Sequence, residues 1–288
     1  MAQPVRHALH AMFAVFLVCL LQGRTEAGAV PISVYGVRYG LPTQLQKFNQ
    51  IDFPANLWIT EMKWDLSETQ GGRRLATDNR SIFVAEFGGA INRYDVDGKF
   101  LGQFADVSDL AGPSPGSPNI ETDGNGNLYV TFSGSASQPR TSFRLAGNGN
   151  VTATFSHVDL VFPRGIDASP NGDVYILNSA AVGIGNKLYR FDSTGSYVND
   201  YGLPQLVNPS DLAIHEAHEE LYIADEFGAS IAIFDLSAGD PVFSRAIPLP
   251  KRPTDIFVEQ GTERIFGVAD LGGFEVSRDG SQFDPFLG

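Results

Sequence analysis

The sequence predicts an all-β fold, a β-propeller with four-stranded antiparallel blades, and six is the expected number of blades. Three observations lead to this prediction. Similar segments recur every 44 to 46 residues, which is the length of one four-stranded blade. Turn dipeptides such as Asp97-Gly98 separate short aromatic and aliphatic runs. The composition, with 31 glycines and 11% aromatic residues, suits short strands joined by tight turns.

Residues 1–29 have the pattern of a secretory signal peptide. Arg6 and His7 precede an apolar run over 8–21, and a small-x-small cleavage pattern follows at 27–29. The run is shorter than the roughly 20 residues that a membrane-spanning helix needs. We therefore expect a mature protein that starts near Val30 and is secreted to the extracellular or periplasmic space. No membrane span is expected after the signal is removed.

Residues 30–72 do not show the repeat clearly. They contain strand-like pieces over 57–60 and 62–64, so the segment is either a divergent blade or the strand that closes the ring. The first reading gives six blades and the second gives five.

Five clearer repeats follow, with expected bounds of about 73–117, 118–162, 163–208, 209–252 and 253–288. Four of them open alike, with Pro118-Asn119-Ile120-Glu121, Pro163-Arg164-Gly165-Ile166, Pro209-Ser210-Asp211-Leu212 and Pro253-Thr254-Asp255-Ile256. These openings predict the first strand of each blade.

The other three strands of a blade are clearest in the third repeat. A turn at 171–173 leads into an apolar run over 174–177, a third strand is expected over 187–192, and the turn at Thr194-Gly195 leads into a fourth over 197–201. Such a meander has two faces to bury. Radial stacking of several meanders covers both faces, which favours a closed ring.

The pattern of proline, a buried aliphatic residue, a glycine turn and a strand such as Leu221-Tyr222-Ile223-Ala224-Asp225 resembles that of NHL repeats. The resemblance covers most of 73–288, and 163–178 and 209–235 match best. The same pattern is similar to the gluconolactonase and senescence-marker family. Both resemblances imply a propeller, whereas activity has to be argued from a site, since propellers host many functions.

The first strand of each blade is expected to line the central channel. The residues near its start therefore converge, and Glu121, Arg164, Asp211 and Asp255 are the candidates at the channel mouth. Converging carboxylates repel unless a cation lies between them, and Ca²⁺ takes oxygen ligands of this kind. One reading is a divalent-cation site held by Asp211, Asp255 and Glu121. The other is that each aspartate caps its own turn and Arg164 neutralises the ring.

Two functional classes follow. The first is a secreted binding module that takes a small molecule, a glycan or a protein at one face of the propeller. The second is a metal-dependent hydrolase, lactonase or lyase at the channel mouth. The resemblance implies a metal held by Glu, Asn and Asp in gluconolactonase-like enzymes, but Ser210 and Asp211 replace the Asn-Gly expected there. The net charge of −13 argues against a nucleic-acid partner.

Overall fold

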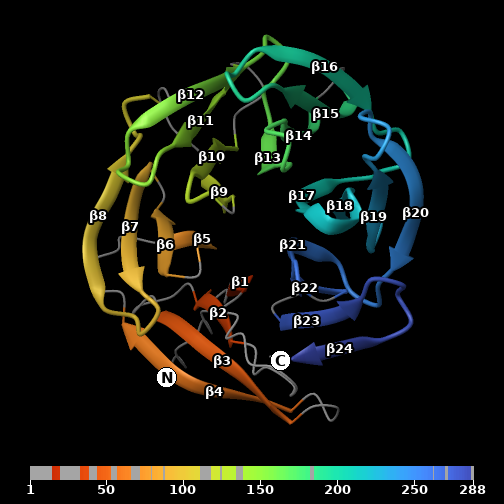
Figure 1. Ribbon diagram of the computed structural model, residues 1–288. Helices are drawn as coiled ribbons and strands as arrows, with labels where there is room; N and C mark the ends of the chain where they lie inside the picture. Colours follow the sequence, from red (N-terminus) through yellow and green to blue (C-terminus); the bar gives the residue numbers. More distant parts are fainter. Residues whose placement is uncertain are drawn as a thin grey trace, which may run out of the picture.

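The structure, a computed structural model, describes residues 15–19, 33–38, 44–52, 57–65, 72–78, 80–86, 88–110, 118–123, 125–133, 139–181, 185–261, 263–269 and 272–286. The first four of these segments are described by their backbone alone. The chain is a β-propeller, in which four-stranded antiparallel sheets stand around a central axis (Figure 1). The predicted fold class is therefore confirmed.

Five sheets lie in the part of the chain with clear repeats. The first two comprise β5 (Gly72–Thr77), β6 (Ser81–Glu86), β7 (Ala90–Asp95) and β8 (Phe100–Asp106), then β9 (Pro118–Thr122), β10 (Leu128–Phe132), β11 (Thr141–Leu145) and β12 (Val151–Ser156). The next comprises β13 (Pro163–Ala168), β14 (Val174–Ala181), β15 (Gly185–Phe191) and β16 (Tyr197–Gly202). The last two comprise β17 (Pro209–His215), β18 (Glu220–Asp225), β19 (Ser230–Asp235) and β20 (Val242–Pro248), then β21 (Pro253–Val258), β22 (Arg264–Ala269), β23 (Gly272–Ser277) and β24 (Phe283–Phe286).

A further sheet precedes these five. It consists of β1 (Val15–Cys19), β2 (Ser33–Arg38), β3 (Gln44–Asp52) and β4 (Leu57–Asp65), and β1 lies against both β5 and β21. Strand β1 falls inside the predicted signal peptide, so cleavage near Val30 would remove the inner strand of this sheet. The blade count of six therefore stays a prediction, as does the cleavage.

The apolar cores lie between neighbouring sheets. One cluster joins Phe83 and Ile91 of one blade to Val130 and Phe143 of the next, and another joins Tyr222 and Ile233 to buried residues of the last blade. Among the five sheets with described side chains, neighbouring sheets thus bury their facing sides against each other, and second strands such as β18 are buried along their whole length. This explains the continuous apolar runs in the sequence, because a strand covered on both faces does not alternate.

The turns between third and fourth strands depend on an aspartate and a glycine. Asp192 accepts hydrogen bonds from the amides of Thr194 and Ser196 at 2.8 and 3.0 Å, and Gly195 has a φ of 96°. Asp95 and Gly98 form the corresponding turn in another blade. These are the turns that the sequence predicts, since a side-chain acceptor and a residue at positive φ close them.

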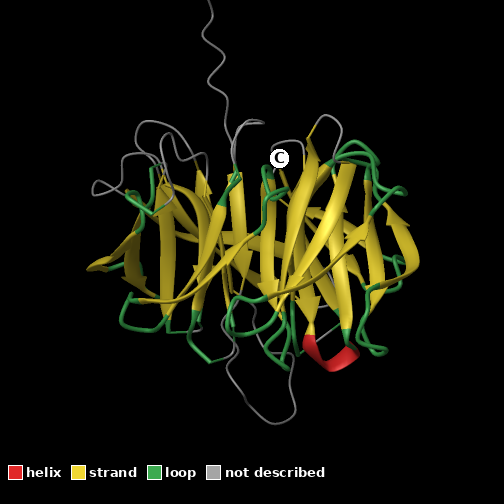
Figure 2. Ribbon diagram, turned by 90° about the horizontal axis from the view of Figure 1, so that it is seen from above, coloured by secondary structure: helices red, strands yellow, loops and turns green. Residues whose placement is uncertain are grey.

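Helical structure among the described residues is limited to one 3-10 turn, η1 (Glu216–His218), at the lower edge in Figure 2. None of the described segments is a helix long and apolar enough to cross a membrane.

Candidate functional site

The innermost strands of the five blades with side chains, β5, β9, β13, β17 and β21, surround the channel (Figure 1). We call the end where these strands begin the upper mouth and the end where they finish the lower mouth. The 3-10 turn η1 marks the lower mouth in Figure 2. The two mouths carry different chemistry.

Equivalent channel positions are set by a bulge that only some inner strands have. Pairing with the second strand shifts register near the start of β5, β13, β17 and β21, whereas β9 pairs without a shift. In each inner strand, the residue directly before the first buried aliphatic residue is therefore equivalent from blade to blade. These equivalent residues are Arg74, Asn119, Gly165, Asp211 and Asp255. Glu121, the predicted third ligand, is not one of these equivalent residues, because the equivalent residue of β9 is Asn119.

These residues connect the inner strands to one another at the upper mouth. Arg74 donates to Asp255 at 2.6 Å, and the amide of Asn119 donates to Asp211 and to the Arg164 carbonyl, both at 2.7 Å. The backbone amide of Ile256 donates to the second oxygen of Asp211 at 3.0 Å. We call Arg74, Asn119, Asp211, Asp255 and the Arg164 carbonyl the inner-strand clasp, since it links all five of these strands.

The clasp has no room for a side chain at Gly165, its fifth equivalent position. A Cβ atom at this position would lie 2.6 Å from the Leu212 amide nitrogen and 3.0 Å from Asp211 Oδ1. Any larger residue would therefore push Asp211 away from Asn119.

The two aspartates of the clasp share a buried environment. Asp211 and Asp255 are 4% and 6% exposed. Burial raises the pKa of Asp211 well above its usual value, the neighbouring Asp255 raises it further, and Arg74 opposes both effects. One positive charge therefore faces two carboxyl groups, and a proton on Asp211 removes their repulsion.

Arg164 does not neutralise these acids, which corrects the second sequence-based reading. Its side chain is exposed and lies in the field of Glu226, while its backbone carbonyl is the part that joins the clasp. Arg74 is the channel cation. Sequence reasoning missed it because its strand begins with Gly72 and lacks the opening proline of the other repeats.

The predicted metal ligands Asp211, Asp255 and Glu121 are brought together only in part. Asp211 and Asp255 are neighbours, but Glu121 lies two residues further along its strand than the clasp residue Asn119. Among the residues that the structure describes, no three His, Cys, Asp or Glu side chains are grouped to hold a metal ion. The clasp meets its need for positive charge through Arg74.

The lower mouth opens into a cavity of about 600 Å³. The ends of the inner strands form its walls, through Thr77, Thr122, Ala168, Ile214 and Val258. The turns that follow these strands form its rim. Among the described residues, six acidic side chains line it, namely Asp78, Glu121, Asp123, Asp167, Glu216 and Glu259, and Arg80 is the one basic lining residue.

Several of these acids already have partners. Asp78 and Asp123 accept backbone hydrogen bonds within their own turns, from Ser81 at 2.7 Å and from Asn125 at 2.9 Å. Glu259 forms an ion pair with Arg264 at 3.2 Å. These three carboxylates shape the rim and are held in place by the protein.

Glu121 and Asp167 differ from the rim acids because they lie inside the channel. Asp167 accepts the amides of Ala168 and Ile214, both at 2.7 Å, yet burial raises its pKa to about 7. The described contact of Glu121 is with the amide of Thr122 at 3.2 Å, and burial followed by the charge of Asp167 raises its pKa well above the usual value. Two poorly compensated carboxyl groups therefore face the cavity.

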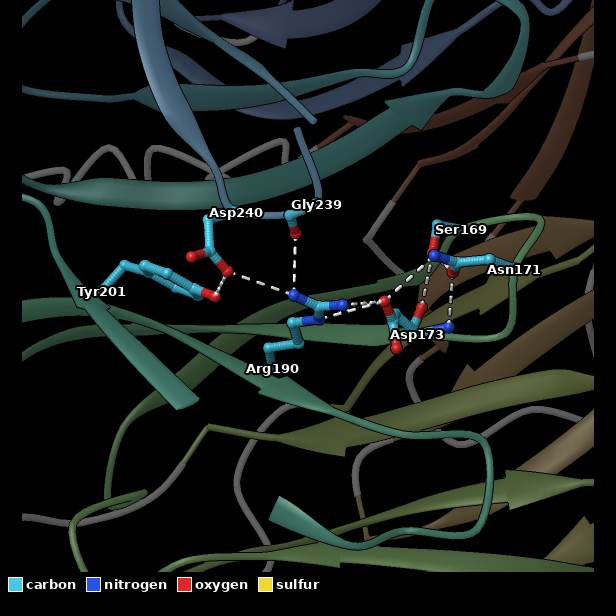
Figure 3. Close-up of polar contacts among 7 residues, drawn as sticks. All are labelled: Ser169, Asn171, Asp173, Arg190, Tyr201, Gly239 and Asp240. Atoms are coloured by element: carbon cyan, nitrogen blue, oxygen red, sulfur yellow. Dashed lines mark hydrogen bonds and ion pairs between the residues drawn. The ribbon is translucent and has the colours of Figure 1, made fainter. Parts of the chain in front are cut away.

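A second set of contacts joins the blades near their outer edge. Arg190 donates to Asp173 at 2.6 Å within its own blade and to the Gly239 carbonyl at 2.8 Å in the next blade (Figure 3). Asp240 also contacts Arg190, at 3.2 Å, and accepts a hydrogen bond from Tyr201 at 2.5 Å. Arg144 makes the equivalent contact with the Ser193 carbonyl at 2.9 Å. We call these contacts the outer latches.

No protein-family model and no curated protein matches the sequence. The fold has many solved counterparts. A protein of unknown function from Bacteroides caccae is 13% identical with a TM-score of 0.62, and the match covers 85% of this chain and 90% of that one. The nidogen/laminin complex contains a chain that is 14% identical with a TM-score of 0.66, covering 89% and 93%.

A putative 6-phosphogluconolactonase from Bacteroides fragilis is 16% identical, with a TM-score of 0.56 and coverage of 94% and 82%. At these identities the likeness establishes the propeller fold alone. The NHL assignment of the repeats stays a prediction.

Proposed function

We propose that this protein is a secreted β-propeller that binds a small, positively charged ligand in the cavity at its lower mouth. The observation that carries the proposal is the cavity itself, whose volume of about 600 Å³ lies in the range of small-molecule sites. Glu121 and Asp167 face its interior without a cationic partner among their described contacts.

The charge of the wall supports a cationic ligand. In the described part of the wall there are six acidic residues and one arginine, and a ligand with an ammonium group would offset the mutual repulsion of the acids. Binding of such a group would also favour the ionised forms of Glu121 and Asp167. The same negative field would repel a phosphorylated, and therefore anionic, ligand.

A second candidate function is hydrolysis of a neutral ester or lactone. Asp167, with its pKa raised to about 7, has the proton affinity of a general base or acid near neutral pH. The putative lactonase with the same fold is consistent with this candidate, although the acidic wall disfavours a phosphorylated substrate.

Three sugars of similar size test the ligand charge. Glucosamine carries an ammonium group, glucose is neutral and glucose 6-phosphate is anionic. In saturation-transfer NMR we expect signal from glucosamine above that from glucose, and none from glucose 6-phosphate. Glu121→Gln should weaken the glucosamine signal, whereas Asp109→Asn, at an exposed acid outside the cavity lining, should preserve it.

A stronger signal from glucose 6-phosphate than from glucosamine would overturn the proposed charge preference. Equal glucosamine signals from wild type and Glu121→Gln would place binding outside the cavity. Hydrolysis of glucono-δ-lactone that Asp167→Asn abolishes would favour the enzyme instead.

Secretion has its own test. N-terminal sequencing of protein recovered outside the producing cell should begin within a few residues of Val30. An intact Met1 on a membrane-bound product would contradict the predicted signal peptide.

A further inference from the structure

A turn at the upper mouth displays an aromatic side chain. Phe227 follows β18 and is 57% exposed, and Val207, in the neighbouring loop, is 61% exposed. Phe227 belongs to a segment, Glu226-Phe227-Gly228-Ala229, whose near copy Glu86-Phe87-Gly88-Gly89 occurs in another blade.

The turn is firmly held by the strand that precedes it. The Asp225 carboxylate accepts the amides of Val207 and Asn208 at 2.9 and 2.7 Å, which ties the two loops together. The amide of Glu226 donates in return to the Asn208 carbonyl at 3.0 Å. The position of Phe227 relative to Val207 is therefore fixed by the backbone.

The same turn contains a backbone strain. Ala229 has a φ of 46°, in the left-handed region that residues with a side chain seldom adopt, where the copy in the other blade has Gly89. Such conformations persist where the surrounding structure over-determines them, and they cluster at functional positions. The strained residue Ala229 thus belongs to the same turn that holds the Phe227 ring in solvent.

One basic side chain contacts Phe227, and two further basic residues belong to the adjoining loop and strand. The guanidinium of Arg252 lies 5.5 Å from the centre of the Phe227 ring, and Lys251 precedes it in the same loop. Arg164 is exposed and interacts with Glu226, next to Phe227. We call Val207, Phe227, Arg164, Lys251 and Arg252 the apolar-basic patch.

The patch is opposite in charge to the rest of the molecule. The patch has three cationic residues, and the described acid next to it is Glu226, while the whole chain has a net charge of −13. A long polyanion such as nucleic acid, or an anionic membrane, would extend beyond the patch and be repelled by the negative charge of the whole protein. A short acidic segment would contact only the patch, whose cationic residues attract it.

We infer that the apolar-basic patch is a docking surface for an acidic polypeptide segment that carries an apolar side chain. The apolar side chain packs against Phe227 and Val207, and the carboxylates of the segment pair with Arg252 and Arg164. Arginine and aromatic side chains are the types that contribute most to such interfaces. This surface lies at the mouth opposite the proposed ligand cavity and is independent of it.

The test uses a fluorescein-labelled peptide of alternating acidic residues with leucine or phenylalanine, and the full chain. Fluorescence anisotropy should show saturable binding that weakens as salt is added. Phe227→Ser and Arg252→Gln should each weaken binding by roughly tenfold, the size expected for anchor residues. Val198→Ser, at an exposed apolar residue of β16 away from the patch, should bind like the wild type.

Four results would overturn the inference. They are no binding of the acidic peptide, equal binding of a peptide with lysine in place of the acids, unchanged binding by both patch variants, and stronger binding of single-stranded DNA or phosphatidylserine vesicles than of the peptide. Circular dichroism melts of each variant establish that lost binding does not come from unfolding.

Discussion

The two mouths of the channel use acidic residues in opposite ways. At the upper mouth, Asp211 and Asp255 are buried and held by Arg74 and Asn119. At the lower mouth, Glu121 and Asp167 face a cavity and have only backbone amides as described hydrogen-bond donors. The difference teaches that an acid in a propeller channel is structural where a neighbouring blade supplies a side-chain donor, as Arg74 and Asn119 do. It is available to a ligand where its described donors are backbone amides alone.

The largest expected effect comes from removing the cation of the clasp. Arg74→Met leaves two buried carboxyl groups without their positive partner, and we expect a loss of roughly 3 kcal/mol in the free energy of unfolding. The loss should be larger at about pH 8 than at about pH 4.5, because protonation of Asp211 relieves the repulsion. Urea denaturation at both pH values measures it.

Lys99→Met is the matched control, since Lys99 is exposed in a turn and its side chain takes no part in the clasp. Equal stability of Arg74→Met and Lys99→Met would show that the clasp does not hold the blades together.

Glu121→Gln should act in the opposite direction. The folded-state pKa of Glu121 lies above its unfolded value, so the wild type loses stability as pH rises from the unfolded pKa through the folded one. The variant lacks this loss and should be more stable than the wild type at about pH 8, with little difference at about pH 4. Thermal melts across this pH range measure the effect, and a variant less stable at both ends would contradict it.

The outer latches should matter less than the clasp. Arg190→Gln removes contacts to Asp173 and to the Gly239 carbonyl, and we expect a loss of about 1 kcal/mol, since the site is partly open to solvent. Arg144→Gln, at the exposed equivalent, should cost less. A loss for Arg190→Gln as large as that for Arg74→Met would remove the distinction between the inner and outer contacts.

Calcium should have the smallest effect. Because Arg74 already faces Asp255 at 2.6 Å, we expect the clasp not to bind added Ca²⁺, so that Ca²⁺ changes the melting temperature equally in the wild type and in the variant with Asp211→Asn and Asp255→Asn. A ligand that binds only the folded state raises the melting temperature. A rise that Asp211→Asn together with Asp255→Asn abolishes would restore the sequence-based metal site.

The fold was accessible from the sequence because its signal is repeated. The period of 44 to 46 residues, the opening prolines and the Asp–Gly turns all recur, so one irregular repeat does not hide the pattern. The first sheet lacks these features. Its inner strand, β1, comes from the stretch whose charge and apolar run predict a signal peptide.

The site was accessible only in part. Asp211 and Asp255 were identified from their equivalent positions, and they are neighbours. Glu121 was grouped with them because it lies near the start of its strand, but it is two residues beyond the clasp residue Asn119. Asp167 went unnoticed because nothing in its local sequence indicates that its strand end opens into a cavity.

Direct titration of the channel carboxyl groups tests the contrast between the mouths most closely. Carbon-13 NMR of aspartate-labelled and glutamate-labelled protein follows Asp167, Glu121 and Asp211 separately. We expect Asp167 to titrate near pH 7 in the free protein, and glucosamine to lower the pKa of Asp167 and Glu121 while leaving that of Asp211 unchanged. If Asp167 titrates near pH 4, or if glucosamine shifts Asp211 and spares the lower mouth, the account of the two mouths is wrong.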